Sequence, residues 1–239
     1  MDIVNRETPP GWARVIDNLN TTLSQELFGG PKSIKMAWVI NLHKFLTLFV
    51  VASLMVLFNT STLAAWVYLA LHGSYGFCWL LKHFAFRDPR WEVKITPGGA
   101  VFTFLLLGTY WVAPYLLISG LNRAEPSHGL VALCIALHTL GVVIMTSADC
   151  QKQFSLKSQR GLITTGMFAR VRHPNYLGEM MVYASYALIV QHWIPWVILM
   201  YWWTMVFLVN MLKIESSLSR YPEWHDYRAK TSMLIPLLL

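Results

Sequence analysis

Apolar residues fall into four runs, each about as long as the roughly 20-residue helix that crosses a membrane. A fifth apolar region is too long for one helix. Gln191, His192 and Pro195 interrupt it, which predicts two helices joined by a tight turn. The pattern therefore predicts an all-α, polytopic transmembrane helical bundle of about six spans, within a range of five to seven. The apolar regions are Met36–Phe58, Thr62–Phe84, Ala100–Ile118, Gly129–Ser147 and Tyr176–Leu212.

The segment before the first run is polar and charged up to Lys35, and it lacks the basic, apolar and small-residue order of a cleavable signal peptide. Residues 9–26 nevertheless carry apolar side chains at helical spacing. This spacing predicts a short helix on the membrane surface, and a loose cap is an equally consistent alternative. The apolar side chains are Trp12, Val15, Ile16, Leu19 and Leu23.

The composition also indicates a membrane protein. Of the 239 residues, 55% are hydrophobic and only 13% are charged, which is too apolar for a soluble domain of this length. Lys and Arg residues before the first run, around the second loop, after the fourth run and in the tail fall on one side of a six-span topology. Arg123 alone lies in an opposite loop, and Lys44 lies within the first run.

By the positive-inside rule, this asymmetry predicts a multi-pass protein with both termini in the cytosol. Such a protein is expected in the endoplasmic reticulum if it is eukaryotic and in the inner membrane if it is bacterial. The net charge of +7 is explained by the topology, and no segment resembles a nucleic-acid-binding module. Cys78, Cys134 and Cys150 show no metal-ligand spacing, so neither a metal site nor a disulfide is expected.

Candidate chemistry is concentrated between Ser147 and Glu179. Five of the 19 Lys and Arg residues lie there against two acids. This balance suits a phosphorylated, multiply anionic ligand or, alternatively, anionic lipid headgroups. No Gly-x-Gly-x-x-Gly and no Walker-type loop is present, so side chains must hold any nucleotide. The first half offers a carboxylate, an amide and two lysines, which either bind such a ligand or merely cap a helix end.

The second half contains R-H-P-N-Y at positions 172–176, which opens the next apolar helix. Proline suits a first helical turn, and it places Arg172 and His173 where free backbone N–H groups attract anions. Glu179 falls on the same face as the Asn-Tyr pair and points into the bundle. A carboxylate at that depth is costly unless it is paired or solvated.

Three motifs resemble the C-terminal half of the steroid 5α-reductase and sterol reductase superfamily, especially its short bacterial-type members. They are A-D-x-Q-K-x-x-x-x-K, G-L-I-x-x-G-x-F and R-x-R-H-P-N-Y-L-G-E, and the tail S-L-S-R-Y-P-E-W-H-D-Y extends the match. Sterol reductases have asparagine and aspartate where this chain has Asp149 and Glu179. The resemblance implies a helical membrane fold that NADPH enters from the cytosolic side. It assigns cofactor binding to Asp149, Gln151, Lys152, Lys157, Arg172, His173, Asn175 and Tyr176.

A second group shares part of this pattern. The isoprenylcysteine and phospholipid methyltransferases, which bind S-adenosylmethionine, also show R-H-P-x-Y-x-G. Their last span usually carries paired glutamates, whereas this chain has Ile214 and Glu215, and the A-D-x-Q-K block fits them poorly. The asparagine in H-P-N-Y and the acid in G-E favour the reductase.

For a reductase, the resemblance implies hydride transfer to a carbon–carbon double bond of a lipophilic steroid, sterol or enone substrate. The second apolar run offers Tyr75 as the catalytic proton donor, with Glu179 as the group that orients it. The alternative is that Tyr75 only packs between helices. A third reading is a non-catalytic membrane protein that binds lipids.

These expectations divide the chain into three parts. Residues 1–35 form a cytosolic N-terminal segment, and residues 36–147 form four transmembrane helices on the side of the lipid substrate. Residues 148–239 form the cofactor-binding region, with a helical hairpin and a cytosolic tail. The sequence leaves the oligomeric state open.

Overall fold

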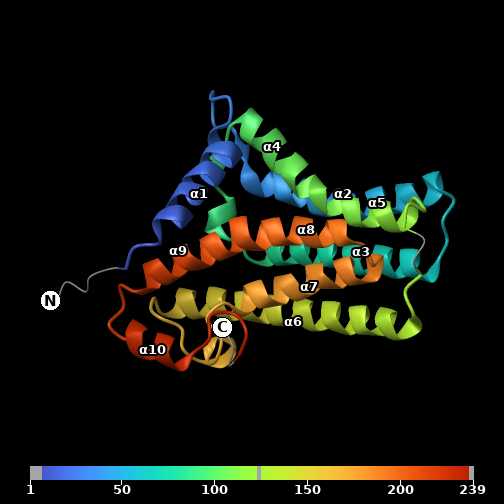
Figure 1. The fold of residues 1–239 in the computed structure, drawn as a ribbon. Coiled ribbons are helices and arrows are strands. Elements are labelled where there is room, and N and C mark those ends of the chain that lie inside the picture. Colours follow the sequence, from blue (N-terminus) through green and yellow to red (C-terminus); the bar gives the residue numbers. More distant parts are fainter. Residues whose placement is uncertain (1–6, 123–124, 237–239) are drawn as a thin grey trace. The chain divides into compact units, whose positions relative to one another are not determined.

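The computed structural model describes residues 7–122 and 125–236, which are largely helical (Figure 1). Arg6 and Arg123, which carry part of the charge asymmetry, lie outside the described residues. The α-helices are α1 (Gly11–Thr21), α2 (Met36–Leu57), α3 (Leu63–Ala85), α4 (Pro97–Gly108), α5 (Val112–Ile118), α6 (His128–Ser158), α7 (Pro174–Val190), α8 (Trp193–Tyr201), α9 (Val209–Leu218) and α10 (Trp224–Lys230).

Short elements complete the described chain. Strands β1 (Ile34–Lys35) and β2 (Lys94–Ile95) pair antiparallel. Segments η2 (Pro89–Trp91), η3 (Thr109–Trp111) and η4 (Gly166–Phe168) are single 3₁₀ turns, and η1 (Thr22–Glu26) and η5 (Trp202–Leu208) are π-helical.

The predicted all-α membrane fold is confirmed. Four described helical segments are long and apolar enough to cross a membrane, by length and composition, and they are Met36–Leu57, Pro97–Ile118, His128–Ser158 and Trp193–Leu218. Helices α3, with 23 residues, and α7, with 17, correspond to the two other predicted spans. The total of six spans stays a prediction.

Helix boundaries follow local sequence signals. The predicted break between α7 and α8 is confirmed, and Gln191 adopts a left-handed backbone conformation there with a φ of 51°. Helix α4 begins three residues before the predicted run because Thr96 accepts a hydrogen bond from the Gly99 N–H and a proline follows it. Helix α6 continues to Ser158, well past the predicted Ser147, because no glycine or proline interrupts the chain before Gly161.

The predicted N-terminal helix is confirmed as α1, which η1 continues. Its apolar residues Trp12, Val15 and Leu19 are exposed by 49%, 67% and 55%. An exposed apolar face on a helix outside the spans suits the headgroup region of a membrane. Its location on a membrane surface stays a prediction.

The chain forms two compact units, each assembled from segments that are distant in sequence. Unit 1 comprises residues 1–17, 139–182 and 201–239, of which the structure describes 7–17, 139–182 and 201–236. Unit 2 comprises residues 18–138 and 183–200, of which 18–122, 125–138 and 183–200 are described. Helix α6 passes from unit 2 into unit 1, and α7 passes from unit 1 into unit 2.

Unit 2 is organised around the packing of α2 on α3. A Cβ atom added at Gly76 of α3 would lie 2.6 Å from the backbone oxygen of Lys44 in α2, so only glycine permits this approach. Beside the short sheet, a buried apolar cluster joins the start of α2 to α3, β2 and α4. It contains Met36, Val39, Ile40, Trp79, Ile95 and Ala100.

Unit 1 is organised around the crossing of α6 and α7. A Cβ atom added at Gly178 would lie 2.5 Å from the backbone oxygen of Gly141, so the two helices meet through glycines. The C-terminal segment is held against the start of α7 by a parallel bridge between Val171 and Ser232. The His173 N–H also donates to the backbone oxygen of Met233.

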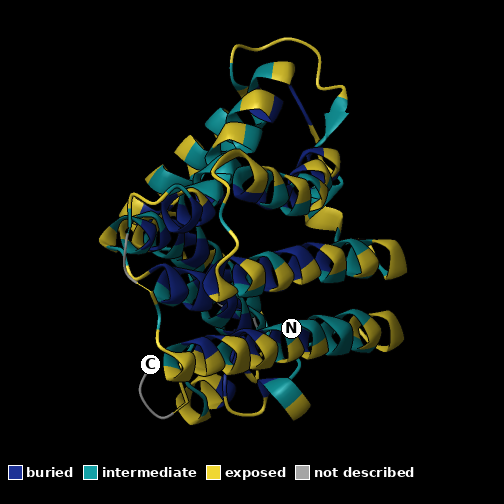
Figure 2. Ribbon diagram, turned by 90° about the vertical axis from the view of Figure 1, so that its right-hand side faces the viewer, coloured by how far each residue is buried: buried dark blue, intermediate teal, exposed yellow. Residues whose placement is uncertain are grey.

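Figure 2 shows that buried and exposed residues lie on different sides of the long helices. On α2 the exposed side consists of apolar residues, which are Trp38, Leu42, Phe45 and Phe49. An exposed apolar stripe on a span is the surface that hydrocarbon tails cover. This exposed apolar stripe therefore supports the conclusion that the chain is a membrane protein.

Candidate functional site

Unit 1 contains a pocket with a volume of about 250 Å³. We call it the basic pocket. Its walls come from α6, the loop that follows α6, the start of α7, the end of α9 and the C-terminal segment. Figure 1 shows the segment around α10 beside that loop, and the Tyr227 hydroxyl donates to the Phe168 backbone oxygen at 2.7 Å. The lining residues are Lys152, Leu156, Gly161, Leu162, Ile163, Phe168, Arg172, His173, Asn175, Ile214, Ser217, Leu218, Arg220, Tyr221 and Tyr227.

Gln151 shapes the loop that closes one side of the basic pocket. Its amide Nε2 donates to the Thr165 backbone oxygen at 2.8 Å, and its Oε1 accepts from the Met167 N–H at 2.9 Å. Gly166 between them has a φ of 59°, and a Cβ there would lie 2.6 Å from the Gln151 oxygen. The backbone conformation therefore favours glycine, and an added Cβ would displace the Gln151 amide from its two hydrogen bonds.

A buried ion pair joins the start of α7 to α9. The Arg172 Nε lies 2.6 Å from the Glu215 Oε1, and the two side chains are only 7% and 8% exposed. The same guanidinium donates to the backbone oxygens of Arg228 and Thr231. Removing one partner of a buried pair leaves an uncompensated charge, at a cost of about 3–5 kcal/mol. Arg172 is thus committed mainly to holding the pocket wall together.

His173 is 2% exposed and lines the same pocket. Its Nε2 lies 3.4 Å from the Glu215 Oε1, within ion-pair distance. This contact does not meet hydrogen-bond geometry, and Nε2 has no hydrogen-bond partner among the described residues. Burial lowers the pKa of His173, and the neighbouring Glu215 carboxylate opposes this effect. A buried ring nitrogen without a hydrogen bond indicates a place for a polar ligand atom.

The other polar side chains of the pocket include two cations. The Arg220 guanidinium donates to the Ser217 hydroxyl at 2.9 Å and to the Tyr221 hydroxyl at 3.1 Å, and Lys152 projects from α6. Burial raises the pKa of Tyr227 to about 12, so its hydroxyl stays protonated. No Asp or Glu is among the described lining residues. The arrangement therefore attracts an anion.

Half of the predicted cofactor residues meet in the basic pocket, and they are Lys152, Arg172, His173 and Asn175. The other half do not line it, and Gln151 instead supports the adjoining loop. Asp149 is half-buried on α6, and Lys157 is exposed with its ammonium 5.8 Å from the centroid of the Phe154 ring. Tyr176 packs edge-on against Phe207, with ring centroids 5.2 Å apart.

The polar pocket residues that sequence reasoning left without a role come from the C-terminal 25 positions. Ser217, Arg220, Tyr221 and Tyr227 belong to, or adjoin, the tail motif that carried part of the resemblance, and Glu215 lies just before it. The signal was thus present in the motif. The structure adds that the tail folds back onto the start of α7, as the pairing of Val171 with Ser232 shows.

The two predicted catalytic residues belong to different units. Tyr75 is fully buried in α3 of unit 2, where its ring lies edge-on to Tyr183 with centroids 5.8 Å apart. Glu179 is half-buried on α7 in unit 1. Orientation of Tyr75 by Glu179 stays a prediction.

Comparisons with known proteins cover most of the chain but name no activity. A family model described as "Protein of unknown function (DUF1295)" matches residues 27–231. The uncharacterized protein C7D4.09c of Schizosaccharomyces pombe is 43% identical over 60 residues, which are 25% of this chain and 20% of that protein. The chemistry of the site therefore has to be argued from its own residues.

Proposed function

This chain belongs to the DUF1295 family, and we propose that it is a membrane-embedded, NADPH-dependent reductase. Its substrate is a lipophilic steroid, sterol or enone lipid, in which it reduces a carbon–carbon double bond. The proposal places the chain within the steroid 5α-reductase and sterol reductase superfamily that its motifs resemble. The observation that carries it is the basic pocket, whose lining includes Lys152, Arg172 and Arg220 and, among the described residues, no Asp or Glu.

The donors of the basic pocket fit a phosphorylated dinucleotide. NADPH carries a pyrophosphate and a further phosphate on one ribose, and Lys and Arg are the side chains that bind phosphate best. The unsatisfied Nε2 of His173 and the amide of Asn175 offer hydrogen bonds to uncharged atoms of a sugar or amide. When bound, NADPH supplies the hydride for the reduction.

The volume of the basic pocket indicates how much of the cofactor unit 1 holds. A pocket for a drug-sized molecule is roughly 300–1,000 Å³, and the basic pocket measures about 250 Å³. The proposal is therefore that unit 1 holds part of the dinucleotide, and the cations of the pocket support the phosphates as that part. Arg172 contributes less than Arg220 because its charge is already paired with Glu215.

S-adenosylmethionine fits this lining less well. It carries a positive sulfonium and no phosphate, so Lys152 and Arg220 would have no anionic counterpart beyond one carboxylate. A lipid-binding protein without a cofactor would have no need of cations in the lining of this pocket. A methyltransferase and a lipid-binding protein are the two alternative outcomes of the test.

The test is a thermal-shift titration of the detergent-purified protein with NADPH, NADH, S-adenosylmethionine and S-adenosylhomocysteine. A ligand that binds only the native state raises its stability by mass action. We expect NADPH to stabilise the protein and NADH to do so less, since it lacks the additional phosphate. Stabilisation by the methionine compounds alone would overturn the proposal in favour of a methyltransferase. Lack of response to all four would favour a lipid-binding protein.

Paired variants locate the binding site. Lys152→Ala and Arg220→Ala should each weaken NADPH binding about 10- to 100-fold, since a hydrogen bond to a charged group contributes roughly 1.5–3 kcal/mol. Lys157→Ala removes the same ammonium from the same helix, outside the pocket lining. A larger loss from Lys157→Ala than from Lys152→Ala would place the cofactor elsewhere along α6.

A further inference from the structure

Unit 2 buries several polar side chains inside its apolar helices. Lys44 of α2 is 4% exposed and His72 of α3 is 2% exposed. A charged group inside a membrane span is costly and usually marks a functional site. None of these side chains belongs to the basic pocket, so they form a second group of polar residues that needs an explanation.

Lys44 is held by aromatic residues. Its ammonium donates a hydrogen bond to the Tyr183 hydroxyl at 2.8 Å. The same nitrogen lies 4.4 Å from the centroid of the Tyr75 ring and 5.3 Å from that of Trp79. Such cation–π contacts stabilise a charge most when water is excluded. Together, the hydrogen bond and the ring contacts hold the Lys44 ammonium beside the Tyr183 hydroxyl.

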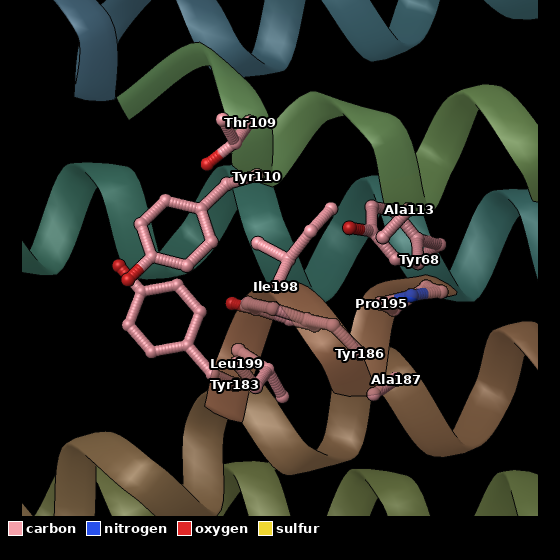
Figure 3. A pocket seen from close by; sticks show the side chains of 10 residues that line it. All are labelled: Tyr68, Thr109, Tyr110, Ala113, Tyr183, Tyr186, Ala187, Pro195, Ile198 and Leu199. Carbon is pink, nitrogen blue, oxygen red and sulfur yellow. The ribbon is translucent and has the colours of Figure 1, made fainter. Parts of the chain in front are cut away.

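Tyr183 lines a small cavity in unit 2, which we call the tyrosine cavity. Its volume is about 20 Å³, and its walls include Tyr68, Tyr110, Tyr183 and Tyr186, together with Pro195 and Ile198 of α8. The rings of Tyr110 and Tyr183 are stacked, with centroids 4.2 Å apart. Figure 3 shows their two hydroxyl groups side by side at one end of the lining residues.

The four tyrosines are not equivalent. The Tyr68 hydroxyl lies 3.1 Å from Nδ1 of His72, and the Tyr186 hydroxyl lies 3.2 Å from Nε2 of His138. These two are paired with imidazoles, whereas Tyr183 is paired with a cation. A phenol that accepts a hydrogen bond from an ammonium is polarised and becomes a stronger donor through its own hydrogen. Of these three tyrosines, Tyr183 is therefore the one best suited to stabilise negative charge.

The volume limits what the tyrosine cavity receives. A water molecule needs roughly 10–15 Å³ of such space, so about 20 Å³ admits a single oxygen atom and not a whole lipid. The hydrocarbon part of a ligand has to displace the apolar wall that α8 provides. The cavity therefore has the size of the oxygen end of a lipophilic molecule.

We propose that Tyr183 binds the carbonyl oxygen of the lipophilic enone substrate, and that Lys44 positions and polarises Tyr183 for this contact. The assignment rests on the proposed reductase function, and it makes Tyr183, in place of Tyr75, the donor to the substrate. Reduction of a conjugated double bond drives negative charge onto the carbonyl oxygen, and a preorganised donor stabilises that charge. Tyr75 presents the face of its ring to Lys44, which suits support of the cation.

The test uses a carbonyl-¹³C-labelled 3-alkylcyclohex-2-enone as probe and infrared difference spectroscopy of the full-length protein in detergent, without cofactor. A hydrogen bond to the carbonyl lowers its stretching frequency. We expect a lowered band with the wild type, loss of the shift and about tenfold weaker binding with Tyr183→Phe, and a smaller shift with Lys44→Met. Tyr115→Phe is the matched control, because Tyr115 lies on α5 of the same unit and is 42% exposed.

Each outcome separates this assignment from the proposed function. A normal shift in Tyr183→Phe overturns the assignment, and so does a loss that appears only in Tyr75→Phe. If the wild type binds the probe with the shifted band but NADPH neither binds nor is oxidised, the oxygen site stands and the reductase proposal fails. If NADPH is oxidised equally by the wild type and Tyr183→Phe, the reductase stands and the Tyr183 assignment fails. Circular dichroism of Lys44→Met and Tyr183→Phe identifies misfolded variants. Lys44→Arg keeps the positive charge, so it should restore part of the shift of the carbonyl band that Lys44→Met loses.

Discussion

The basic pocket of unit 1 and the tyrosine cavity of unit 2 are built from opposite kinds of polar group. The basic pocket is wide, at about 250 Å³, and presents Lys152 and Arg220 from a helix end and the C-terminal tail. The tyrosine cavity is narrow, at about 20 Å³, and its polar lining includes the side chains of four tyrosines. A wide pocket with charges suits an anionic ligand that arrives from water, and a narrow cavity with neutral donors suits one oxygen of a lipid.

The two sites also depend on different interactions for their shape. The wall of the basic pocket depends on the Arg172–Glu215 ion pair and on a tail that returns to α7. The tyrosine cavity is lined by the stacked rings of Tyr110 and Tyr183. The contact of Tyr183 with Lys44 comes from α2, which packs closely on α3 at Gly76. Changes to an ion pair and changes to packing should therefore affect the two sites separately.

The largest effect is expected from Glu215→Ala in unit 1. The variant leaves the Arg172 guanidinium buried without its carboxylate, which should lower the free energy of unfolding by about 3–5 kcal/mol. Denaturant unfolding in mixed micelles, followed by circular dichroism, measures this difference. NADPH binding should weaken as well, while the infrared band of an enone in unit 2 should be unaffected.

Glu223→Ala serves as the control for that variant. Glu223 is exposed just before α10, and an exposed substitution should change the stability by less than about 0.5 kcal/mol. If Glu215→Ala were as stable as Glu223→Ala, the ion pair would not hold the pocket wall. The contrast in how the two sites keep their shape would then be lost.

The elements of both units could be predicted from local sequence, because apolar length and helix-ending residues act over short distances. The break at Gln191 is an example. The grouping of Lys152, Arg172, His173 and Asn175 was instead expected from the resemblance of the motifs, and the pocket contains these four of the eight residues assigned. The approach of Lys44 to Tyr183 could not be predicted, since 139 positions separate them and neither residue belongs to a motif. The end of α6 at Ser158 could not be fixed for a different reason. The apolar pattern ends at Ser147, and the polar part of a helix has no such pattern to mark its end.

An intermediate effect is expected from Gly76→Ala in unit 2. The added methyl group would lie 2.6 Å from the Lys44 backbone oxygen, so α2 and α3 must separate, and such overpacking costs about 1–3 kcal/mol. Because Lys44 moves with this backbone, the infrared shift of the bound enone should decrease. Stabilisation by NADPH should be retained, since the basic pocket lies in unit 1.

Gly129→Ala is the matched control within unit 2. A Cβ atom there meets nothing closer than the Ser127 hydroxyl at 4.0 Å, so alanine should be neutral or stabilise the helix by up to about 1 kcal/mol. Equal loss of the enone shift and of NADPH stabilisation in Gly76→Ala would contradict the separation of the two sites. Denaturant unfolding measures the stability of both variants, and infrared spectroscopy measures the shift of the bound enone in each.

The smallest effect concerns the pH dependence of unit 1. Burial lowers the pKa of His173 in the folded protein, whereas an unfolded histidine titrates near about 6.5. Below that pH the unfolded chain binds more protons than the folded one, so stability falls as the pH falls, by at most about 1.4 kcal/mol per pH unit for one proton. His173→Gln should make this fall less steep between about pH 7 and pH 5.

His225→Gln, which removes an exposed histidine of the same unit, is the control for this measurement. Unfolding titrations at several pH values compare the slopes of the three proteins. If His173→Gln kept the slope of the wild type, the imidazole would take up its proton in the folded protein as readily as in the unfolded chain. The basic pocket would then gain a positive charge on mild acidification, which would strengthen its preference for phosphate. In that case the contrast with the uncharged lining of the tyrosine cavity would increase as the pH fell.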